Sequence, residues 1–137
     1  MSTLQRAIEI AFEAHAGQVD KSGRPYISHP IAVMRYLEGE VTQICGVLHD
    51  VVEDTPVTLE HLSEELFSPE IITAIDCLTR RKNEDYWDYL ARVMSNAIAC
   101  RVKLADLEDN LDPRRALPHN LKYKIALRLI QEELGQE

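Results

Sequence analysis

The sequence has few basic residues, few cysteines and no long apolar run. Its 15 Lys and Arg residues against 23 Asp and Glu residues give a net charge of −8 at pH 7 with neutral histidines. A protein that binds duplex nucleic acid normally carries a basic surface, so a nucleic acid polymer is not expected as a partner. The three cysteines are an odd, widely spaced set, which predicts neither a disulfide framework nor a CxxC site.

Two further absences concern location. No segment reaches the roughly 18 apolar residues of a membrane span, and the N-terminal MSTLQRAIEI lacks the basic-then-apolar pattern of a signal peptide. We therefore expect no membrane association and a reducing cytoplasm. Small phosphorylated ligands are compatible with the acidic composition, because a local group of Lys and Arg or a bound cation can reverse the field nearby.

The apolar residues that are present recur at helical spacing. No run alternates apolar and polar residues over the length of a strand, so the sequence predicts an all-α protein. Its 137 residues suit one domain, residues 1–137, with about eight helices. Ser2 and Gln5 predict a capping box for the first helix. Helices are expected over residues 3–16, 42–54, 86–94, 97–111 and 120–134, with others opening at Ser28, Thr58 and Ser68.

The strongest local signal is HDVVED at residues 49–54. On one continuous helix, with about 100° per residue, His49, Asp50, Glu53 and Asp54 share one arc, and the apolar residues occupy the other. Crowded carboxylates repel one another unless a cation or a network compensates them. Imidazole with carboxylate suits Mn²⁺, Fe²⁺, Zn²⁺ or Co²⁺. The alternative is a solvated acidic helix face without a metal.

One segment seldom supplies all the ligands of a metal, so further candidates are needed from elsewhere. His29 in SHP and Asp106 in KLADLEDN are the candidates. Asp106 stands among apolar residues, and a buried carboxylate is costly unless it is paired or coordinated. As alternatives, His29 could cap a helix or fill the core, and Asp106 could pair with Lys103 or Arg101.

An ordered set of motifs extends this picture: AHAGQ, KSGRPYISHP, HDVVEDT, LTRR and KLADLEDN, between residue 7 and about residue 112. The set resembles the HD-domain metal-dependent phosphohydrolases, in particular the hydrolase domain of RelA/SpoT proteins and the small alarmone hydrolases. The resemblance implies a helical HD-domain bundle that binds one divalent metal, usually Mn²⁺. The ligands that it implies are His29, His49, Asp50 and Asp106.

The resemblance also implies a reaction and a substrate. Glu53 and Asp54 match the acidic pair that positions and deprotonates the attacking water, with Glu53 preferred because its side chain is longer. The implied substrate is a small nucleotide, most specifically guanosine 3′,5′-bis(diphosphate) (ppGpp), which would lose pyrophosphate from its 3′ position. The implied substrate contacts are Lys21, Ser22, Tyr26, Lys103 and Asn110, with Asn110 at the sugar.

Two positions depart from the family pattern. Asp20 stands where alarmone hydrolases usually carry an Arg that holds guanine, and Leu107 replaces a basic residue. A carboxylate cannot stack on a purine as guanidinium does. The alternatives are therefore hydrolysis of another nucleotide or phosphoester, or a non-catalytic nucleotide-binding regulator. The remaining basic runs, which include Arg80 and the pair Arg114-Arg115, are interpreted as solvated, with contact to phosphates at a pocket rim as the alternative. The aromatic residues of the next segment are interpreted as packing residues, with stacking on a base as the alternative; they are Tyr86, Trp87 and Tyr89.

Overall fold

The computed structural model describes residues 2–115 and 120–135, and over these residues the chain is helical, without a β-strand. The predicted all-α class is confirmed. An isolated bridge between Val19 and Pro25 closes the loop after the first helix. The helices are α1 (Leu4–Ala14), α2 (Ser28–Tyr36), α3 (Glu40–Leu48), α4 (Val51–Asp54), α5 (Leu59–Glu64), α6 (Pro69–Leu78), α7 (Tyr86–Met94), α8 (Ala97–Asn110), the 3₁₀ helix η1 (Pro113–Arg115) and α9 (Leu121–Glu133).

The first helix begins one residue later than the expected capping box implies. Thr3 is the N-cap, and its hydroxyl oxygen accepts from the backbone N–H of Arg6 at 3.2 Å. The proposed box of Ser2 and Gln5 is therefore wrong, although the physical device is the same, a hydroxyl that satisfies a free amide of the first turn.

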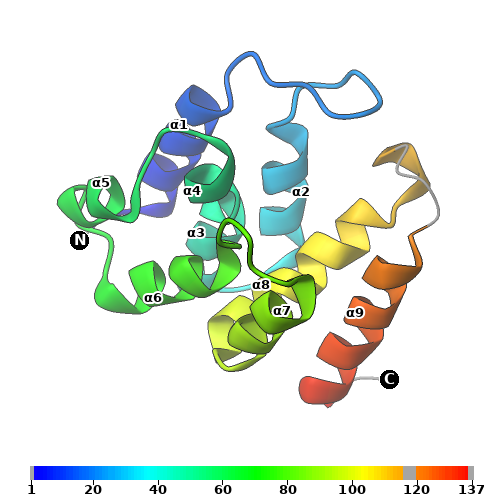
Figure 1. The fold of residues 1–137 in the computed structure, drawn as a ribbon. Helices are drawn as coiled ribbons and strands as arrows, with labels where there is room; N and C mark the ends of the chain where they lie inside the picture. The colour runs from blue at the N-terminus through cyan, green and yellow to red at the C-terminus, as the bar shows by residue number, and fades with distance from the viewer. Residues whose placement is uncertain (1, 116–119, 136–137) are drawn as a thin grey trace.

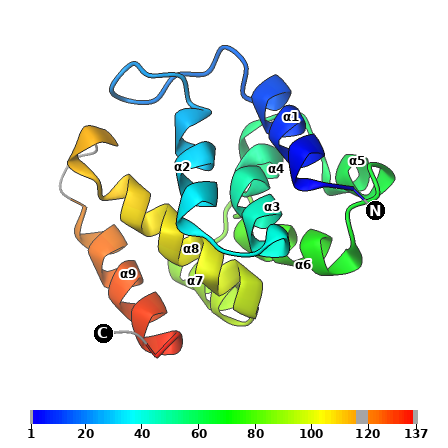
Figure 2. The same ribbon diagram turned by 180° about the vertical axis from the view of Figure 1, so that it is seen from behind.

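The helices α3 and α8 form the centre of the molecule. α3 contacts α1, α2, α6 and α8, and α8 also contacts α2, α6, α7 and α9. Figures 1 and 2 show α1 and α5 at one edge of the fold and α9 at the other. Because α8 is covered on several sides, polar residues on it such as Lys103 and Asp106 are buried and must find partners inside the protein. None of the helices in the described ranges combines the length and apolar character that crossing a bilayer requires.

The helix expected over residues 42–54 is interrupted at His49 and Asp50, which corrects the prediction of one continuous helix. α3 ends at Leu48 and α4 begins at Val51. In an uninterrupted helix, the carbonyl oxygen of Gly46 would accept the amide of Asp50. It accepts instead from His49, from the backbone N–H at 3.5 Å and from the side-chain Nδ1 at 2.6 Å. A side chain of the candidate site therefore takes part in ending α3.

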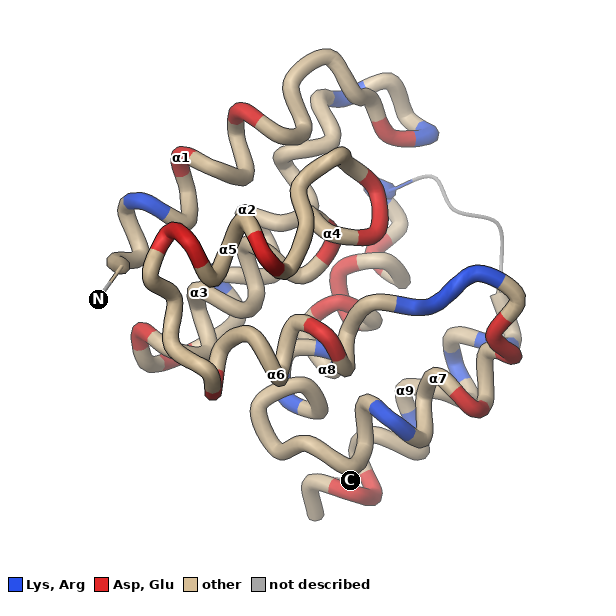
Figure 3. Tube along the Cα trace, turned by 60° about the vertical axis from the view of Figure 1, so that its left-hand side comes forward, with Lys and Arg blue, Asp and Glu red and all other residues tan. Residues whose placement is uncertain are grey.

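One arginine holds the connection between α6 and α7. Arg92 donates two hydrogen bonds of 2.8 Å to the two carboxylate oxygens of Glu84, and further bonds to backbone carbonyl oxygens at the end of α6. The connection carries the basic run at residues 80–82, blue in Figure 3. The backbone N–H of Arg80 donates to Glu53 Oε1 at 2.8 Å, so this connection supports Glu53 of α4.

Glu84→Gln is expected to make the free energy of unfolding less dependent on pH in the acidic range. The hydrogen bonds from Arg92 lower the pKa of Glu84 from 4.5 to about 2. Because the folded-state pKa lies below the unfolded-state value, the stabilisation is complete above about pH 4.5 and is lost as the pH falls toward about 2. Urea unfolding of both proteins across this range measures the difference.

The exposed Glu60 on α5 provides the control for this prediction. Glu60→Gln should keep the parental dependence of stability on pH. Equal slopes for the parental protein and Glu84→Gln would contradict a stabilising role of the Arg92 clamp.

Candidate active site

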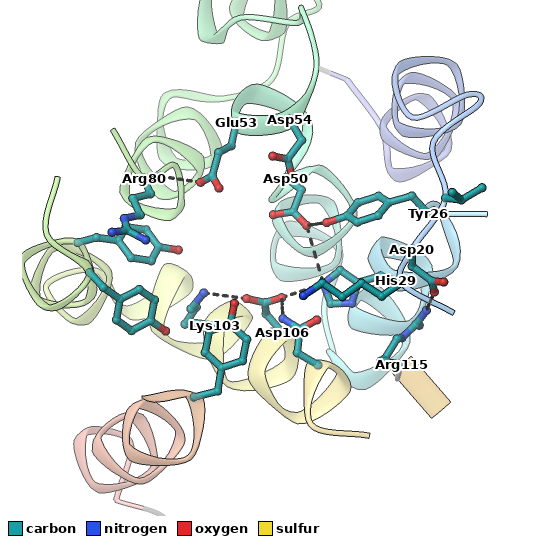
Figure 4. Close-up of a pocket in the computed structure, with 16 residues that line it drawn as sticks. Asp20, Tyr26, His29, Asp50, Glu53, Asp54, Arg80, Lys103, Asp106 and Arg115 are labelled. Atoms are coloured by element: carbon teal, nitrogen blue, oxygen red, sulfur yellow. Dashed lines mark hydrogen bonds and ion pairs between the residues drawn. The ribbon is translucent and has the colours of Figure 1, made fainter. Parts of the chain in front are cut away.

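Side chains from two distant parts of the chain meet in one group. His29 lies in the first turn of α2, His49 follows the last residue of α3, and Asp50 precedes the first residue of α4. Each offers one ligand atom, and these atoms lie within 4.8 Å of one another. Both histidines are buried. Figure 4 shows His29 and Asp50 in the pocket that these residues line.

Asp106 on α8 adds a second carboxylate. Its Oδ1 lies 2.8 Å from His29 Nε2 and 3.2 Å from His49 Nε2. Its Oδ2 accepts from Lys103 Nζ at 2.8 Å, and Asn110 Nδ2 donates to Oδ1 at 3.1 Å. The ion pair with Lys103, which the sequence left as an alternative, thus exists together with the approach to the histidines.

The second nitrogen of each imidazole is also occupied. His29 Nδ1 donates to Asp109 Oδ2, and His49 Nδ1 donates to the carbonyl oxygen of Gly46, both at 2.6 Å. With the proton on Nδ1, the Nε2 atom of each ring faces the carboxylates and is the atom available to a cation. The hydroxyl of Tyr26 donates to Asp50 Oδ2 at 2.6 Å and fixes that carboxylate.

The charges of this group depend strongly on one another. Burial opposes the charged form of His49, but Asp50 and Asp106 outweigh it and raise the pKa of His49 well above its usual value. Burial also opposes ionisation of Asp106, but Lys103 and His49 outweigh it and hold its pKa well below the usual range. The ionised carboxylates therefore require positive charge on or between the imidazoles.

Glu53 and Asp54 in α4 lie on the wall of the same pocket (Figure 4). Both side chains reach solvent, yet partial removal from water raises the pKa of each. For Asp54 the negative charge of Asp50 adds to this effect, and its pKa rises to about 6. For Glu53 the backbone N–H of Arg80 acts in the opposite direction without cancelling it. Carboxyl groups with raised pKa values are suited to exchange protons near neutral pH.

The pocket has a volume of about 390 Å³. Four of the five expected substrate-binding residues line it: Lys21, Tyr26, Lys103 and Asn110. Ser22 does not belong to the lining, because its hydroxyl is turned to Asp20 and donates to Oδ1 at 2.8 Å. Lys103 is buried, and its charge is already engaged by Asp106.

Aromatic and basic residues form one wall of the pocket, and Figure 4 shows Arg80 across the pocket from Tyr26. Tyr86, Tyr89 and Arg80 contribute to it, and the guanidinium of Arg80 lies 5.5 Å from the centre of the Tyr86 ring. Arg80 is exposed just beyond the end of α6, as the solvated interpretation expects, and it also lies at the rim of the pocket. Tyr86 and Tyr89 are buried, as packing residues should be, and line the pocket as well. Their spacing of three residues on α7 was the available signal.

Two buried residues of the site, Asp109 and Arg115, are not among the metal, catalytic or substrate-binding residues that the sequence predicts. Asp109 contacts His29, and Arg115 Nε donates to Asp109 Oδ2 at 2.7 Å. The interpretation of Arg114 and Arg115 as solvated holds for Arg114, which is exposed, and is wrong for Arg115. Nothing in the sequence distinguishes these neighbouring arginines, because the difference arises from the packing of η1 against the start of α2.

The helical fold and the cluster of two imidazoles and two carboxylates define a helical domain with a candidate divalent-metal site. Residues 7–111 match the family profile described as HD domain. The chain belongs to the HD domain family, as the sequence resemblance implied.

Curated relatives match over most of this chain. A probable GTP pyrophosphokinase of Mycobacterium leprae is 35% identical in an alignment 131 residues long, which covers 86% of this chain and 16% of the relative. A guanosine-3′,5′-bis(diphosphate) 3′-pyrophosphohydrolase of Spiroplasma citri is 37% identical in an alignment 134 residues long, which covers 89% of this chain and 17% of the relative. The bifunctional (p)ppGpp synthase/hydrolase SpoT of Escherichia coli K12 is 33% identical in an alignment 138 residues long, gaps included, which covers 90% of this chain and 20% of the relative. The chain thus spans a fifth or less of the length of these relatives.

A solved structure, described as a metazoan ortholog of SpoT that hydrolyzes ppGpp, is also similar. Its TM-score is 0.66 at 24% sequence identity, and the match covers 98% of this chain and 96% of that chain. The two chains therefore share one fold over nearly their whole length.

Proposed function

We propose that this chain is a metal-dependent phosphohydrolase of a small nucleotide, and that ppGpp, cleaved at its 3′-pyrophosphate, is its substrate. The observation that carries the proposal is that two histidines and two carboxylates meet at the pocket whose wall also carries Glu53 and Asp54. The names of the relatives from Spiroplasma citri and Escherichia coli support this activity. A pocket of about 390 Å³ is also of the size that binds small molecules.

The proposed ligands of one divalent cation are His29, His49, Asp50 and Asp106. The donor set fits such an ion, because the Nε2 atoms of both rings and Oδ1 of Asp106 already face one another. Imidazole and carboxylate together suit Mn²⁺, which we propose as the resident metal, as well as Fe²⁺, Zn²⁺ and Co²⁺. When bound, such a cation lowers the pKa of water and neutralises phosphate oxygens.

Glu53 is the proposed proton acceptor, with Asp54 as its companion. The backbone N–H of Arg80 orients Glu53 through Oε1, which leaves Oε2 to accept a proton. The water oxygen attacks phosphorus and its proton passes to Glu53. The bond between phosphorus and the ribose 3′ oxygen breaks, that oxygen takes up a proton from solvent water, and pyrophosphate is released. Glu53 then returns its proton to the solvent, so that one water is consumed in each cycle. Lys21 is proposed to contact the substrate phosphates and Asn110 the sugar.

Asp20 favours a second candidate substrate. Its Oδ1 accepts from the Ser22 amide and hydroxyl and from the Arg24 amide, and its Oδ2 contacts Arg115. Asp20 thus serves the loop and offers no cationic plane for guanine. A related nucleotide with another base is therefore the alternative, cleaved by the same metal chemistry.

A substrate panel tests the proposed function. The protein is incubated with Mn²⁺ and ppGpp, its adenosine analogue, NADPH, or simple nucleoside mono- and triphosphates, and released phosphate and pyrophosphate are measured. We expect pyrophosphate release from ppGpp that EDTA abolishes and excess Mn²⁺ restores. Release from another compound alone would keep the metal chemistry and change the substrate. The panel is repeated with Fe²⁺, Zn²⁺ and Co²⁺ in place of Mn²⁺. If none of the four metals supports release from any compound, the result would favour a nucleotide-binding regulator.

Other expectations stay predictions. These are the extent of the single domain over residues 1–137, the cytoplasmic location, and the absence of nucleic acid and membrane partners.

A further inference from the structure

The side chain of His29 forms a hydrogen bond with Asp109, a carboxylate that is not one of the proposed metal ligands. Its Nδ1 donates to Asp109 Oδ2 at 2.6 Å, whereas its Nε2 faces Asp106 Oδ1 at 2.8 Å. Only 3% of Asp109 is exposed. A carboxylate buried to this degree needs compensating partners, so the groups that hold Asp109 decide how firmly it can hold His29.

Arg115 supplies the second partner of Asp109. Its Nε donates to Oδ2 of Asp109 at 2.7 Å. Its Nη1 donates to the hydroxyl of Ser28 at 2.7 Å, and its Nη2 donates to the carbonyl oxygen of Ser28 at 3.0 Å. Since Ser28 directly precedes His29, one guanidinium fixes both the carboxylate behind the imidazole and the backbone that carries it. The planar fork of Arg makes these bonds together, which a Lys ammonium cannot do.

The same guanidinium reaches the loop at residues 17–27. Arg115 Nη1 lies 3.3 Å from Asp20 Oδ2. Oδ1 of Asp20 accepts from the amide and hydroxyl of Ser22 at 2.9 and 2.8 Å and from the amide of Arg24 at 3.0 Å. Asp20 therefore stabilises the turn that contains Lys21. Arg115 joins this turn to the start of α2, because it contacts both Asp20 and Ser28.

We infer that Asp109 is a positioning residue for His29, and that Arg115 couples the metal site to the substrate-side loop through Asp109 and Asp20. The inference rests on the proposed function, because it takes His29 as a metal ligand. Asp109 keeps the proton of His29 on Nδ1 and so leaves Nε2 to the cation. Loss of an outer partner of this kind costs about 10–100-fold in metal affinity.

Two conservative variants test the inference on the full chain. Asp109→Asn keeps the shape of the side chain and removes its charge, whereas Arg115→Lys keeps the charge and removes the fork. In both we expect the dissociation constant for Mn²⁺, measured by isothermal titration calorimetry on metal-free protein, to rise about tenfold or more. The exposed neighbours give matched controls, Glu108→Gln and Arg114→Lys, which should bind Mn²⁺ as the parental protein does.

A spectroscopic readout separates positioning from a general loss of structure. In metal-free protein, the proton between His29 Nδ1 and Asp109 Oδ2 should give a strongly downfield imidazole signal in the ¹H NMR spectrum, assigned by its loss in His29→Gln. Asp109→Asn should shift or remove this signal while the dispersion of the amide signals stays parental. Glu108→Gln should leave the signal unchanged.

A third variant, Asp20→Asn, tests the contact between Arg115 and the loop at residues 17–27. Asp20→Asn weakens the contact with Arg115 without touching His29 or Asp109. It should raise KM severalfold and leave the dissociation constant for Mn²⁺ unchanged, whereas Arg115→Lys should raise both. An unchanged KM in Asp20→Asn would overturn the coupling to the loop.

The outcomes distinguish the inference from the proposed function. Parental Mn²⁺ affinity in Asp109→Asn and Arg115→Lys would overturn the inference and leave the proposed metal site standing. Failure of the parental protein to bind Mn²⁺, Zn²⁺, Fe²⁺ or Co²⁺ would overturn the proposed function and the inference with it. If one variant fails to fold, the other decides, because the two changes affect different side chains of the same network.

Discussion

Glu53→Gln is expected to lower kcat by about two to four orders of magnitude, the usual contribution of general acid–base help. Gln keeps an oxygen that can accept the backbone N–H of Arg80, so the side chain should stay where Glu53 is held. It cannot take up a proton. Because Glu53 is outside the proposed ligand set, Mn²⁺ affinity should stay close to parental. The measurements are pyrophosphate release at saturating substrate and Mn²⁺, and calorimetric titration with Mn²⁺.

The same measurements on Asp54→Asn complete the comparison. Glu60→Gln, on the exposed side of α5, is the control and should keep the parental activity. The comparison shows which carboxylate takes the proton. A larger loss in Asp54→Asn than in Glu53→Gln would assign that role to Asp54, whose pKa of about 6 also suits it. Full activity in Glu53→Gln would exclude Glu53 from proton transfer.

The sequence predicts those features that short-range patterns encode. Helical periodicity is repeated along the whole chain, and this is why the all-α class could be predicted. His29, His49, Asp50 and Asp106 each stand in a short motif with apolar neighbours, so each could be named as a candidate without knowledge of the fold. The structure brings all four into contact distance.

Features that depend on side-chain packing were missed. Periodicity treats residues 42–54 as one helix, because it has no means to foresee that the His49 side chain bonds to the Gly46 carbonyl and interrupts it. Arg80 and Arg115 look like solvated charges in the sequence. Their roles arise from partners 27 residues away in one case and up to 95 residues away in the other. Spacing rules act over one or two helical turns and cannot reach that far.

Asp106→Asn is expected to lower both metal affinity and stability. The dissociation constant for Mn²⁺ should rise by more than about a hundredfold, beyond the cost of losing an outer partner. The free energy of unfolding should fall by about 3–5 kcal/mol, because Lys103 is left as a buried charge without its carboxylate. Calorimetric titration and urea unfolding measure the two effects separately.

The double variant Lys103→Met with Asp106→Asn separates the two roles of Asp106, which are to bind the metal and to neutralise the buried Lys103. Replacing both partners of a buried ion pair by uncharged groups is often neutral for stability, so the double variant should recover most of the lost free energy of unfolding. Its Mn²⁺ affinity should stay low, because the carboxylate that faces His29 and His49 is still missing. Lys103→Met alone leaves that carboxylate in place and should still bind Mn²⁺. Recovery of Mn²⁺ binding in the double variant would mean that Asp106 acts through the stability of α8 and not as a ligand.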